Sequence, residues 1–381
     1  MKANVLKYSV LLVLAVIMLG GLYYLNLPNR HKAIIKTKLR HGLGLVDNSW
    51  NVVYEDSQTA FITPTLVIDG IYKSMEGPKV MRAFQLDPSR ADLVFITGFT
   101  TEALSPTEVD NLSDDYICHT NVDYYDGEHY SRWDLNHRIG MQYPRLTSMS
   151  HGIESYNLPK GYGFPVFTNE NLFLSTQTLN HNVSEEVFGV KHKISLNYSE
   201  AVESLKPLYS KTIFIMLPYD KDNPFEGPSD ENPNACLPVE TKNHSYVNEN
   251  GQALSGHWVI FPGEAEYSFD VTAQMQLQDS TSLHHAAIHV HPFTESLSLV
   301  DKTMNSILFE SRAQNYRDKI GLEDVSYFSS SEGIMLYPDH RYELVLKVNN
   351  TTGIDQDMMA SMFIFLYDKE MDEKLKAFHD K

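Results

Sequence analysis

Short apolar or alternating runs, separated by turn residues, make up most of the chain after about Asn51. In the first half these runs are Ala60–Ile68, Ala91–Thr97, Tyr116–Tyr124, Leu172–Leu179 and Thr212–Leu217. In the second half they are His257–Ile260, Ala265–Leu277, Leu283–His291, Leu297–Leu299, Ile307–Phe309, Tyr342–Val348 and Met359–Tyr367. Helical periodicity is scarce between them. Short strands at such spacing are typical of an all-β sandwich or barrel.

A break in this pattern divides the strands into two groups. Residues 219–251 are rich in Pro, Asn, Asp and Glu and have no sustained apolar period, which indicates an interdomain loop. We therefore expect a first β-sandwich domain over 59–218, the loop over 219–254 and a second β-sandwich domain over 255–368. A linker over 30–58 precedes them, and a C-terminal tail over 369–381 is expected to form a short helix.

The N-terminal segment, residues 1–29, is expected to be a membrane anchor or a signal segment. Its run Tyr8–Leu27 has no charge and is long enough to cross a bilayer as a transmembrane helix. A signal peptide cleaved near Leu19-Gly20-Gly21 is the alternative. Two basic residues precede the run and five follow it, a bias that by itself favours a cytoplasmic body.

The charge of the chain excludes some partners. The formal net charge is -18, although residues 1–40 hold seven Lys and Arg and no acid, so the remainder carries 24 basic against 49 acidic residues. Such a body repels nucleic acid and anionic lipid, and we expect no nucleic-acid partner and membrane contact only through the N-terminal segment. The two cysteines, Cys118 and Cys236, allow at most one disulfide.

The densest group of potential metal ligands is the stretch His284–His291. In a strand, His289 and His291 project from the same face, roughly 6.6 Å apart at about 3.3 Å per residue, a spacing that suits one metal ion. His285 shares this face but lies roughly 13 Å behind His289, and His284 points the other way. A half-buried strand with hydrogen-bonded imidazoles is the plainer alternative.

A second stretch adds a sulfur ligand. Met359 opens an apolar strand, and although methionine usually fills gaps in a core, two imidazoles and a thioether form a ligand set that suits copper cycling between Cu(I) and Cu(II). The same set suits zinc or magnesium poorly. A weakly bound thioether also leaves coordination positions open, as oxygen activation requires.

Motifs in both halves resemble the ascorbate-dependent type II copper monooxygenases, the family of peptidylglycine α-hydroxylating monooxygenase and dopamine β-monooxygenase. The turn Phe261–Glu264 is similar to the family's P-G-E, and H-x-H and the strand-opening methionine follow at similar spacing. The run Leu158–Phe164 resembles the peptide enzyme's L-P-K-G-x-G-F. The resemblance covers most of the chain after about Pro64. It implies two tandem antiparallel jelly-roll-like domains and a secretory or periplasmic location, which overrides the charge bias at the anchor.

The resemblance also implies roles for particular residues. His289, His291 and Met359 match the copper at which oxygen binds and substrate is hydroxylated, and His284 is expected beside these ligands. The peptide enzyme grips its substrate with an arginine and a tyrosine, and these positions hold Ala287 and Phe363 here. We therefore expect no peptide amidation.

The family's other copper, which stores an electron, is altered in this sequence. Its adjacent His-His pair reads Cys118-His119, and its later histidine falls on or near Leu179, with His181 two residues further on. Either Cys118, His119 and His181 form a degenerate metal site, or the site is lost and Cys118 is a buried thiol or pairs with Cys236.

Three functions follow as hypotheses. The first is a membrane-anchored copper monooxygenase that hydroxylates a small molecule with O2 and ascorbate or another reductant. The second is a non-catalytic copper-binding or structural protein that has lost the electron-storing site. The third is a metal-free sugar-binding or glycan-processing double jelly roll.

Overall fold

The structure is a computed structural model that describes residues 2–141, 144–218, 245–247 and 251–379. Most of the predicted interdomain loop over 219–254, and Cys236 with it, lies outside these ranges. The described part is built mainly of β-strands arranged in several sheets, so the all-β prediction is confirmed.

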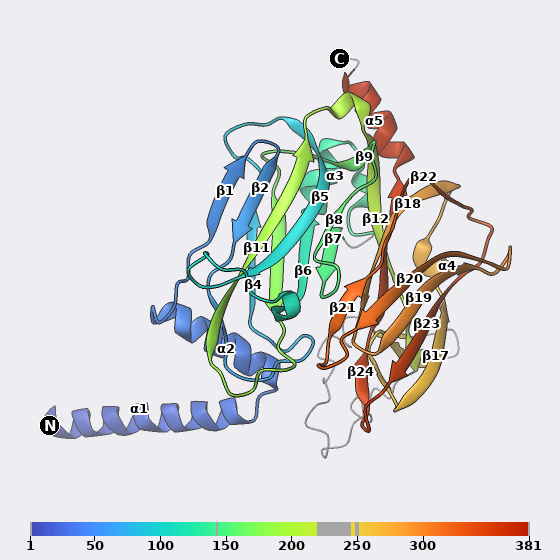
Figure 1. Cartoon of the computed structure of the whole chain (residues 1–381). Helices are drawn as coiled ribbons and strands as arrows, with labels where there is room; N and C mark the ends of the chain where they lie inside the picture. Colours follow the sequence, from blue (N-terminus) through green and yellow to red (C-terminus); the bar gives the residue numbers. More distant parts are fainter. Residues whose placement is uncertain (1, 142–143, 219–244, 248–250, 380–381) are drawn as a thin grey trace.

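One eleven-stranded sheet runs through both halves of the chain (Figure 1). Its main path, in spatial order, is β1 (Asn51–Glu55), β2 (Gln58–Ile62), β11 (Phe188–Ser199), β5 (Leu93–Leu104), β9 (Tyr162–Phe167), β12 (Lys206–Phe214), β25 (Ala360–Tyr367), β18 (Thr281–Val290) and β22 (Phe328–Leu336). Two short strands lie off this path, β3 (Leu66–Ile68) against β11 and β8 (Ser155–Asn157) against β5.

Two further sheets belong to one half each. The N-terminal half holds a four-stranded sheet in the order β4 (Lys79–Phe84), β10 (Leu172–Thr178), β6 (Ile117–Tyr124) and β7 (Arg145–Ser150). The C-terminal half holds a five-stranded sheet in the order β17 (Gly263–Asp270), β23 (Tyr342–Asn350), β19 (Thr294–Asp301), β20 (Ser306–Asn315) and β21 (Leu322–Val325). Small sheets join β16 (Trp258–Ile260) to β24 (Gln356–Met358), and β13 (Leu217–Pro218) to β15 (Ala253–Ser255) and β14 (Ser245–Val247).

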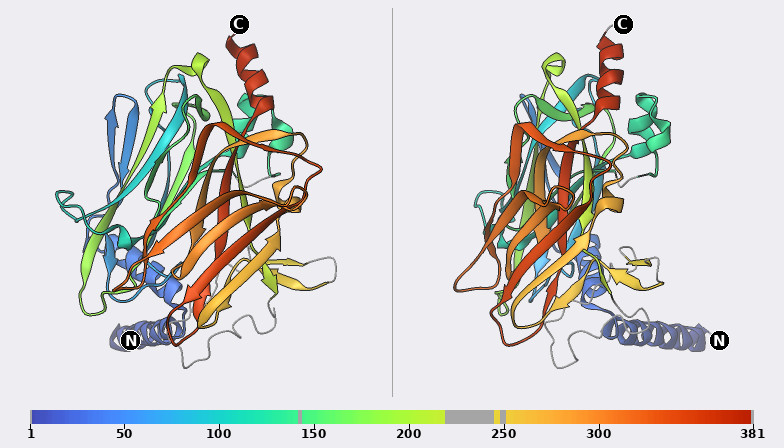
Figure 2. Two further views of the ribbon diagram at one scale, coloured as in Figure 1. Left: turned by 45° about the vertical axis from the view of Figure 1, so that its right-hand side comes forward. Right: turned by 90° about the vertical axis from the view of Figure 1, so that its right-hand side faces the viewer.

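Strand β12 connects the two halves. It pairs antiparallel with β25 from Leu208↔Tyr367 to Phe214↔Ser361, but it meets β9 only near Lys206, through two parallel residue pairs. The two views of Figure 2 accordingly show the orange and red C-terminal strands beside the green and blue N-terminal strands. One continuous apolar core fills both halves, with side chains such as Phe95, Phe99 and Phe365 fully buried.

The helices lie mostly at the surface. They are α1 (Lys2–Leu25), α2 (Asn29–Gly42), α3 (Asp126–Arg132), α4 (Thr272–Met275) and α5 (Lys369–His379), with 3-10 turns η1 (Asp114–Tyr116), η2 (Asn136–Arg138) and η3 (Val202–Ser204). The segment predicted as a linker thus contains α2 and β1. The run Ala265–Leu277 forms β17 followed by α4, because its alternating pattern ends at Asp270.

Helix α1 extends away from the body, and α2 packs against the N-terminal half (Figure 1). Lys36 and Arg40 of α2 form ion pairs with Asp69 at 3.0 and 2.8 Å. Within the described ranges, no helix combines the length and the apolar composition that crossing a bilayer requires. The predicted span over Tyr8–Leu27 therefore finds no support in the fold, and the extracytoplasmic location stays a prediction.

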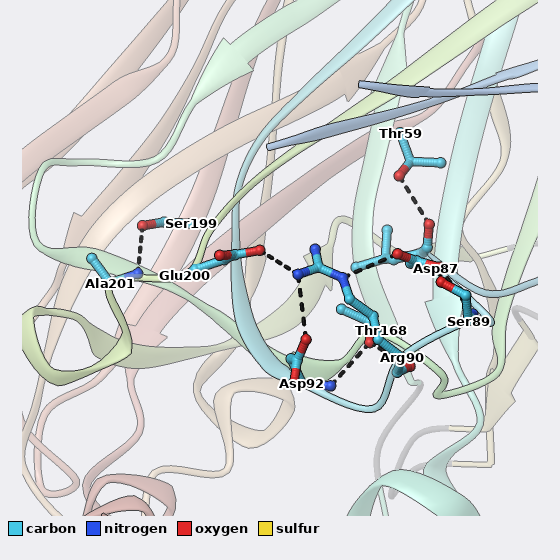
Figure 3. A network of polar contacts seen from close by, with 10 residues as sticks. Thr59, Asp87, Ser89, Arg90, Asp92, Thr168, Ser199, Glu200 and Ala201 are labelled. Atoms are coloured by element: carbon cyan, nitrogen blue, oxygen red, sulfur yellow. Dashed lines mark hydrogen bonds and ion pairs between the residues drawn. The ribbon is translucent and has the colours of Figure 1, made fainter. Parts of the chain in front are cut away.

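An ion-pair network fixes the loop between β4 and β5 (Figure 3). The Arg90 guanidinium contacts Asp87, Asp92 and Glu200 at 3.0, 3.3 and 2.5 Å. Thr168 donates a hydrogen bond to the backbone carbonyl of Arg90 at 2.8 Å and accepts one from the Asp92 backbone at 3.1 Å. This partly exposed network closes one end of the first half.

Candidate metal centre

The pairing of β18 with β25 brings the predicted copper ligands to one place. His289 lies opposite Ser361, and His291 and Met359 follow just beyond the ends of the two strands. Residues opposite each other in an antiparallel pair share a face, so all three side chains belong to the same side of the sheet. The His289 and His291 rings are 5.5 Å apart between centroids, and the residues are 9% and 4% exposed.

The two neighbouring methionines have different surroundings. Met358 is fully buried at the end of β24, and its sulfur accepts a hydrogen bond from the Thr294 hydroxyl at 3.6 Å. Met359 lines the same cleft as His289. The local geometry therefore makes Met359, and not Met358, the available thioether.

Both ring nitrogens of His291 have polar neighbours. Nδ1 lies 2.7 Å from Oδ2 of Asp357, and Nε2 lies 3.1 Å from the hydroxyl of Ser74. Burial acts to raise the pKa of Asp357, but His291, with lesser contributions from His257 and His181, outweighs burial and holds this pKa below its usual value. Metal-binding histidines commonly donate their second ring N–H to a carboxylate in this way.

Sequence reasoning missed Ser74, His257 and Asp357. Asp357 could have been found, because it stands two residues before Met359 and so has the same strand parity. His257 lies with its ring 5.7 Å from that of His291. Ser74 comes from a turn 217 positions before His291, and no local pattern in the sequence marks it.

The predicted first-domain residues lie against the second-domain ones. The Cys118 sulfur is 3.3 Å from Nδ1 of His119 and 3.9 Å from the Ser74 hydroxyl. The His119 and His289 rings are 6.4 Å apart between centroids. Across β10, the residue opposite His119 is Gln177, so a histidine is missing there. The pair Cys118-His119 thus borders the His289 group.

His181 belongs to the surroundings of Asp357. The pKa of His181 is lowered to about 4, mainly by burial; Asp357 acts to raise it, and His151 and His291 add to the lowering. These influences place His181 within electrostatic range of the His291–Asp357 pair. It stays neutral at physiological pH, as a metal-binding imidazole must be.

His284 and His285 have other neighbours. The His284 ring contacts the Ser282 hydroxyl at 2.7 Å and the Ser330 carbonyl at 2.9 Å, and it stacks on Tyr162. His285 stacks on Tyr156, and burial lowers its pKa to about 3. A register shift in β18 between Leu283 and His285 separates these rings from the His289 end of the strand. The structure therefore does not bring His284 to the candidate ligands.

A cleft of about 660 Å³ lies beside His289. The four-stranded sheet forms one wall with residues of β4, β10, β6 and β7, and β12, β25 and the end of β18 form the other. His119, His289, Met359, Ser361 and Phe363 share this cleft. Its volume lies within the range of pockets that hold small molecules.

Ser74, His291 and Asp357 stand in the order nucleophile, base and acid of a hydrolase triad. However, Ser74 is 7% exposed and is not among the residues that line the cleft. Over residues 2–141, 144–218, 245–247 and 251–379, no three His, Cys, Asp or Glu side chains are arranged to hold a metal.

The motif Leu158–Phe164 has a structural explanation. It turns the chain into β9, with Gly161 at a φ of 90° that favours glycine. A Cβ on Gly163 would lie 2.8 Å from the backbone oxygen of Ile96 on β5. Glycine is therefore required at both positions for the turn and for the close approach of the two strands.

Comparisons with known proteins do not assign the chain to a family. No protein-family model and no curated protein matches the chain. Among solved structures, N-glycanase F (PNGase F) aligns with 9% identity and a TM-score of 0.35, over 82% of this chain and 96% of that one. The CUB1-EGF-CUB2 domains of rat MASP-1 align with 8% identity and a TM-score of 0.17, over 81% and 97%. Similarities this distant carry no conclusion about function.

Proposed function

We propose that this protein is a copper-dependent monooxygenase that hydroxylates a small molecule with O2 and an external reductant such as ascorbate. The observation that carries the proposal is the meeting of His289, His291 and Met359 at one end of β18 and β25, beside a cleft of about 660 Å³. These residues lie up to 70 positions apart in the sequence, and only the folded C-terminal half assembles them.

The donor set fits copper. Two neutral imidazoles and a thioether are borderline-to-soft ligands, which favour copper over magnesium or calcium. The set consists of two histidines and one methionine. It therefore differs from a metal site built only from His, Cys, Asp and Glu. Asp357 also supports the fit, because a carboxylate at His291 Nδ1 fixes the ring orientation and leaves Nε2 as the ligating atom.

The chain's own residues prepare the site in three ways. The Asp357 carboxylate lies 2.7 Å from Nδ1 of His291, and the Ser74 hydroxyl contacts Nε2, the atom that would hold the ion, at 3.1 Å. Phe363 and Met359 line the cleft with apolar side chains. Copper, when bound there, would supply one-electron redox chemistry and the activation of oxygen.

A non-catalytic copper-binding protein is the second candidate. Gln177, opposite His119, favours this alternative, because the strand that would complete an electron-storing site offers no histidine at that position. Copper held by His289, His291 and Met359 alone would then have no second copper to supply an electron.

Copper content and oxygen uptake separate the candidates. The full-length protein is loaded with Cu(I), dialysed and analysed, and ascorbate-dependent oxygen consumption is recorded with and without His289→Ala. One copper per chain, lost with His289→Ala, supports a copper site. Oxygen uptake that disappears in the same variant supports the monooxygenase, whereas copper without uptake supports the second candidate. Full copper retention by His289→Ala would refute both.

A further inference from the structure

The four-stranded sheet presents a row of polar side chains to the cleft. On β6, His119, Asn121 and Asp123 all line the cleft, because every second residue of a strand has the same face. Asn121 lies opposite Ser175 on β10 and opposite Ser148 on β7, and both serines line the cleft as well. Residues from three neighbouring strands therefore place their polar groups around Asn121.

The contacts of Asn121 fix the orientation of its side-chain amide. Oδ1 accepts a hydrogen bond from Nη1 of Arg145 at 2.9 Å and another from the Ser148 hydroxyl at 2.6 Å. A guanidinium has only donors, so the atom that faces Arg145 must be the amide oxygen. Both donors come from β7, and the amide nitrogen therefore faces away from that strand. Within the described part of the chain, no group accepts a hydrogen bond from this nitrogen.

The two N–H groups of Asn121 are donors held ready at the cleft. Asn121 is 7% exposed, and an amide buried to this degree normally makes its hydrogen bonds, because each missing one costs free energy. The Ser175 hydroxyl, 5% exposed and on the paired strand, also has no hydrogen-bond partner among the residues that the structure describes. A molecule in the cleft that carries an acceptor can satisfy both groups.

Asp123 supplies an acceptor beside these donors. Its Oδ1 accepts a hydrogen bond from Nε of Arg145 at 2.9 Å, and its Oδ2 receives none from the described residues. Burial raises the pKa of Asp123, and Arg145 and Lys79 oppose that rise, so both cations of this wall act on the same carboxylate. Lys211, whose Nζ lies 6.0 Å from the centroid of the Tyr209 ring, belongs to the other face of β12. The wall thus offers donors and an acceptor two residues apart on one strand.

The rest of the cleft sets the length and the character of a ligand. Phe214 and Phe363 bring aromatic side chains from the opposite wall. Along β6, His119 stands one step of roughly 7 Å from Asn121, and the His119 ring lies 6.4 Å from the ring of His289. A molecule held at Asn121 therefore reaches the candidate metal centre with a body about as long as an aromatic ring and a two-carbon chain.

We propose that the cleft binds a neutral small molecule with a primary carboxamide head, whose oxygen accepts hydrogen bonds from Asn121 and Ser175 and whose N–H2 group donates to Asp123. The apolar body lies against the aromatic side chains and points toward His289. A carboxamide fits because it is neutral and has its acceptor and its donors on different atoms, as the wall does. The reaction at the far end rests on the copper function proposed above, but the binding of the head group does not.

Three probes of one outline test the head group. They are 3-phenylpropanamide, 3-phenylpropanoate and 4-phenylbutan-2-one, which carry an amino group, an anionic oxygen or a methyl group on the same carbonyl carbon. Binding to the full-length protein is measured by isothermal titration calorimetry at pH 7, with a chelator present. We expect the amide to bind about tenfold more tightly than the ketone, which cannot donate to Asp123. The carboxylate should also bind more weakly than the amide. Equal affinities, tightest binding of the carboxylate, or no binding of any probe at millimolar concentration would overturn the proposal.

Two isosteric variants exchange donors and acceptor. Asn121→Asp keeps the oxygen that β7 contacts and replaces the N–H2 group by a second oxygen, so the amide and the ketone should both bind about tenfold more weakly. In Asp123→Asn the oxygen still faces Arg145 and an N–H2 group faces the cleft, so the preference for the amide over the ketone should disappear. Asn136→Asp is the control, since Asn136 accepts a hydrogen bond from the Ser131 hydroxyl outside the cleft and should match the wild type. Circular dichroism confirms folding. Unchanged amide affinity in Asn121→Asp, or an intact amide preference in folded Asp123→Asn, would refute the proposed contacts.

Copper analysis of the same samples separates this inference from the proposed function. Asn121→Asp should hold as much copper as the wild type, because Asn121 is not a candidate ligand. Amide binding without any copper site would leave the carboxamide site standing and refute the monooxygenase. A copper site without a preference for the amide would do the reverse.

Discussion

Asp357 offers the sharpest test of the metal centre, because it touches a candidate ligand without being one. Its carboxylate oxygen lies 2.7 Å from Nδ1 of His291. In Asp357→Asn an amide oxygen of the same shape can still accept the Nδ1 proton, so the change removes the charge and keeps the geometry. Charged and neutral hydrogen bonds differ by about 1–1.5 kcal/mol, which corresponds to about tenfold in affinity. Asp357→Ala also removes the acceptor and should approach 100-fold, the upper range for such supporting residues.

The measurement is competition for Cu(I) with a chromophoric chelator under anaerobic conditions. Asp324→Asn is the matched control, since it removes the same charge from an exposed position on β21 and should leave copper affinity unchanged. Circular dichroism confirms that each variant is folded. If Asp357→Asn and Asp357→Ala both bind Cu(I) as tightly as the wild type, His291 is not a ligand in the orientation that the structure shows.

Three further predictions concern sulfur, pH and stability. Met359→Leu should remove the copper–sulfur contribution from the X-ray absorption spectrum of the reduced protein, whereas Met358→Leu, in the core, should keep it. The pKa of Lys211 falls from its ordinary 10.5 to about 8 in the folded protein, so the unfolded chain binds more protons than the folded one between these two pH values. The free energy of unfolding of the wild type, relative to that of Lys211→Met, should therefore rise with pH across this window. Arg138→Met leaves Asp368, 4% exposed in its side chain, without its partner, and should lower the free energy of unfolding by about 3 kcal/mol in urea titrations.

The strands near the metal centre were predictable from local pattern. The run Leu283–His291 corresponds to β18 (Thr281–Val290), and Met359–Tyr367 corresponds to β25 (Ala360–Tyr367). Strand parity also predicted that His289 and His291 share a face. Alternation of apolar and polar residues depends only on the two faces of a strand. It can therefore be recognised in the sequence without knowing which strands pair with one another.

The rest of the site depends on pairings between distant segments. Ser74 reaches His291 because the turn before β4 packs against the other half, and Phe214 reaches the cleft because β12 pairs with β25. Neither pairing has a local signature. His284 was expected beside the ligands although parity points it to the other face, and the structure places its ring against Tyr162 and the Ser330 carbonyl. Register shifts and long-range strand order are set by the whole fold.

The central position of β25 in the sheet has a consequence for how the protein folds during synthesis. This strand completes the sheet between β12 and β18, yet it follows every other described strand in the sequence and is translated after them. Until then, a nascent chain carries two unprotected strand edges, each able to pair with another molecule. We therefore expect the nascent chain to depend on chaperones until β25 has been translated, and a chain cut short before Ala360 to aggregate and not to persist as a soluble N-terminal half.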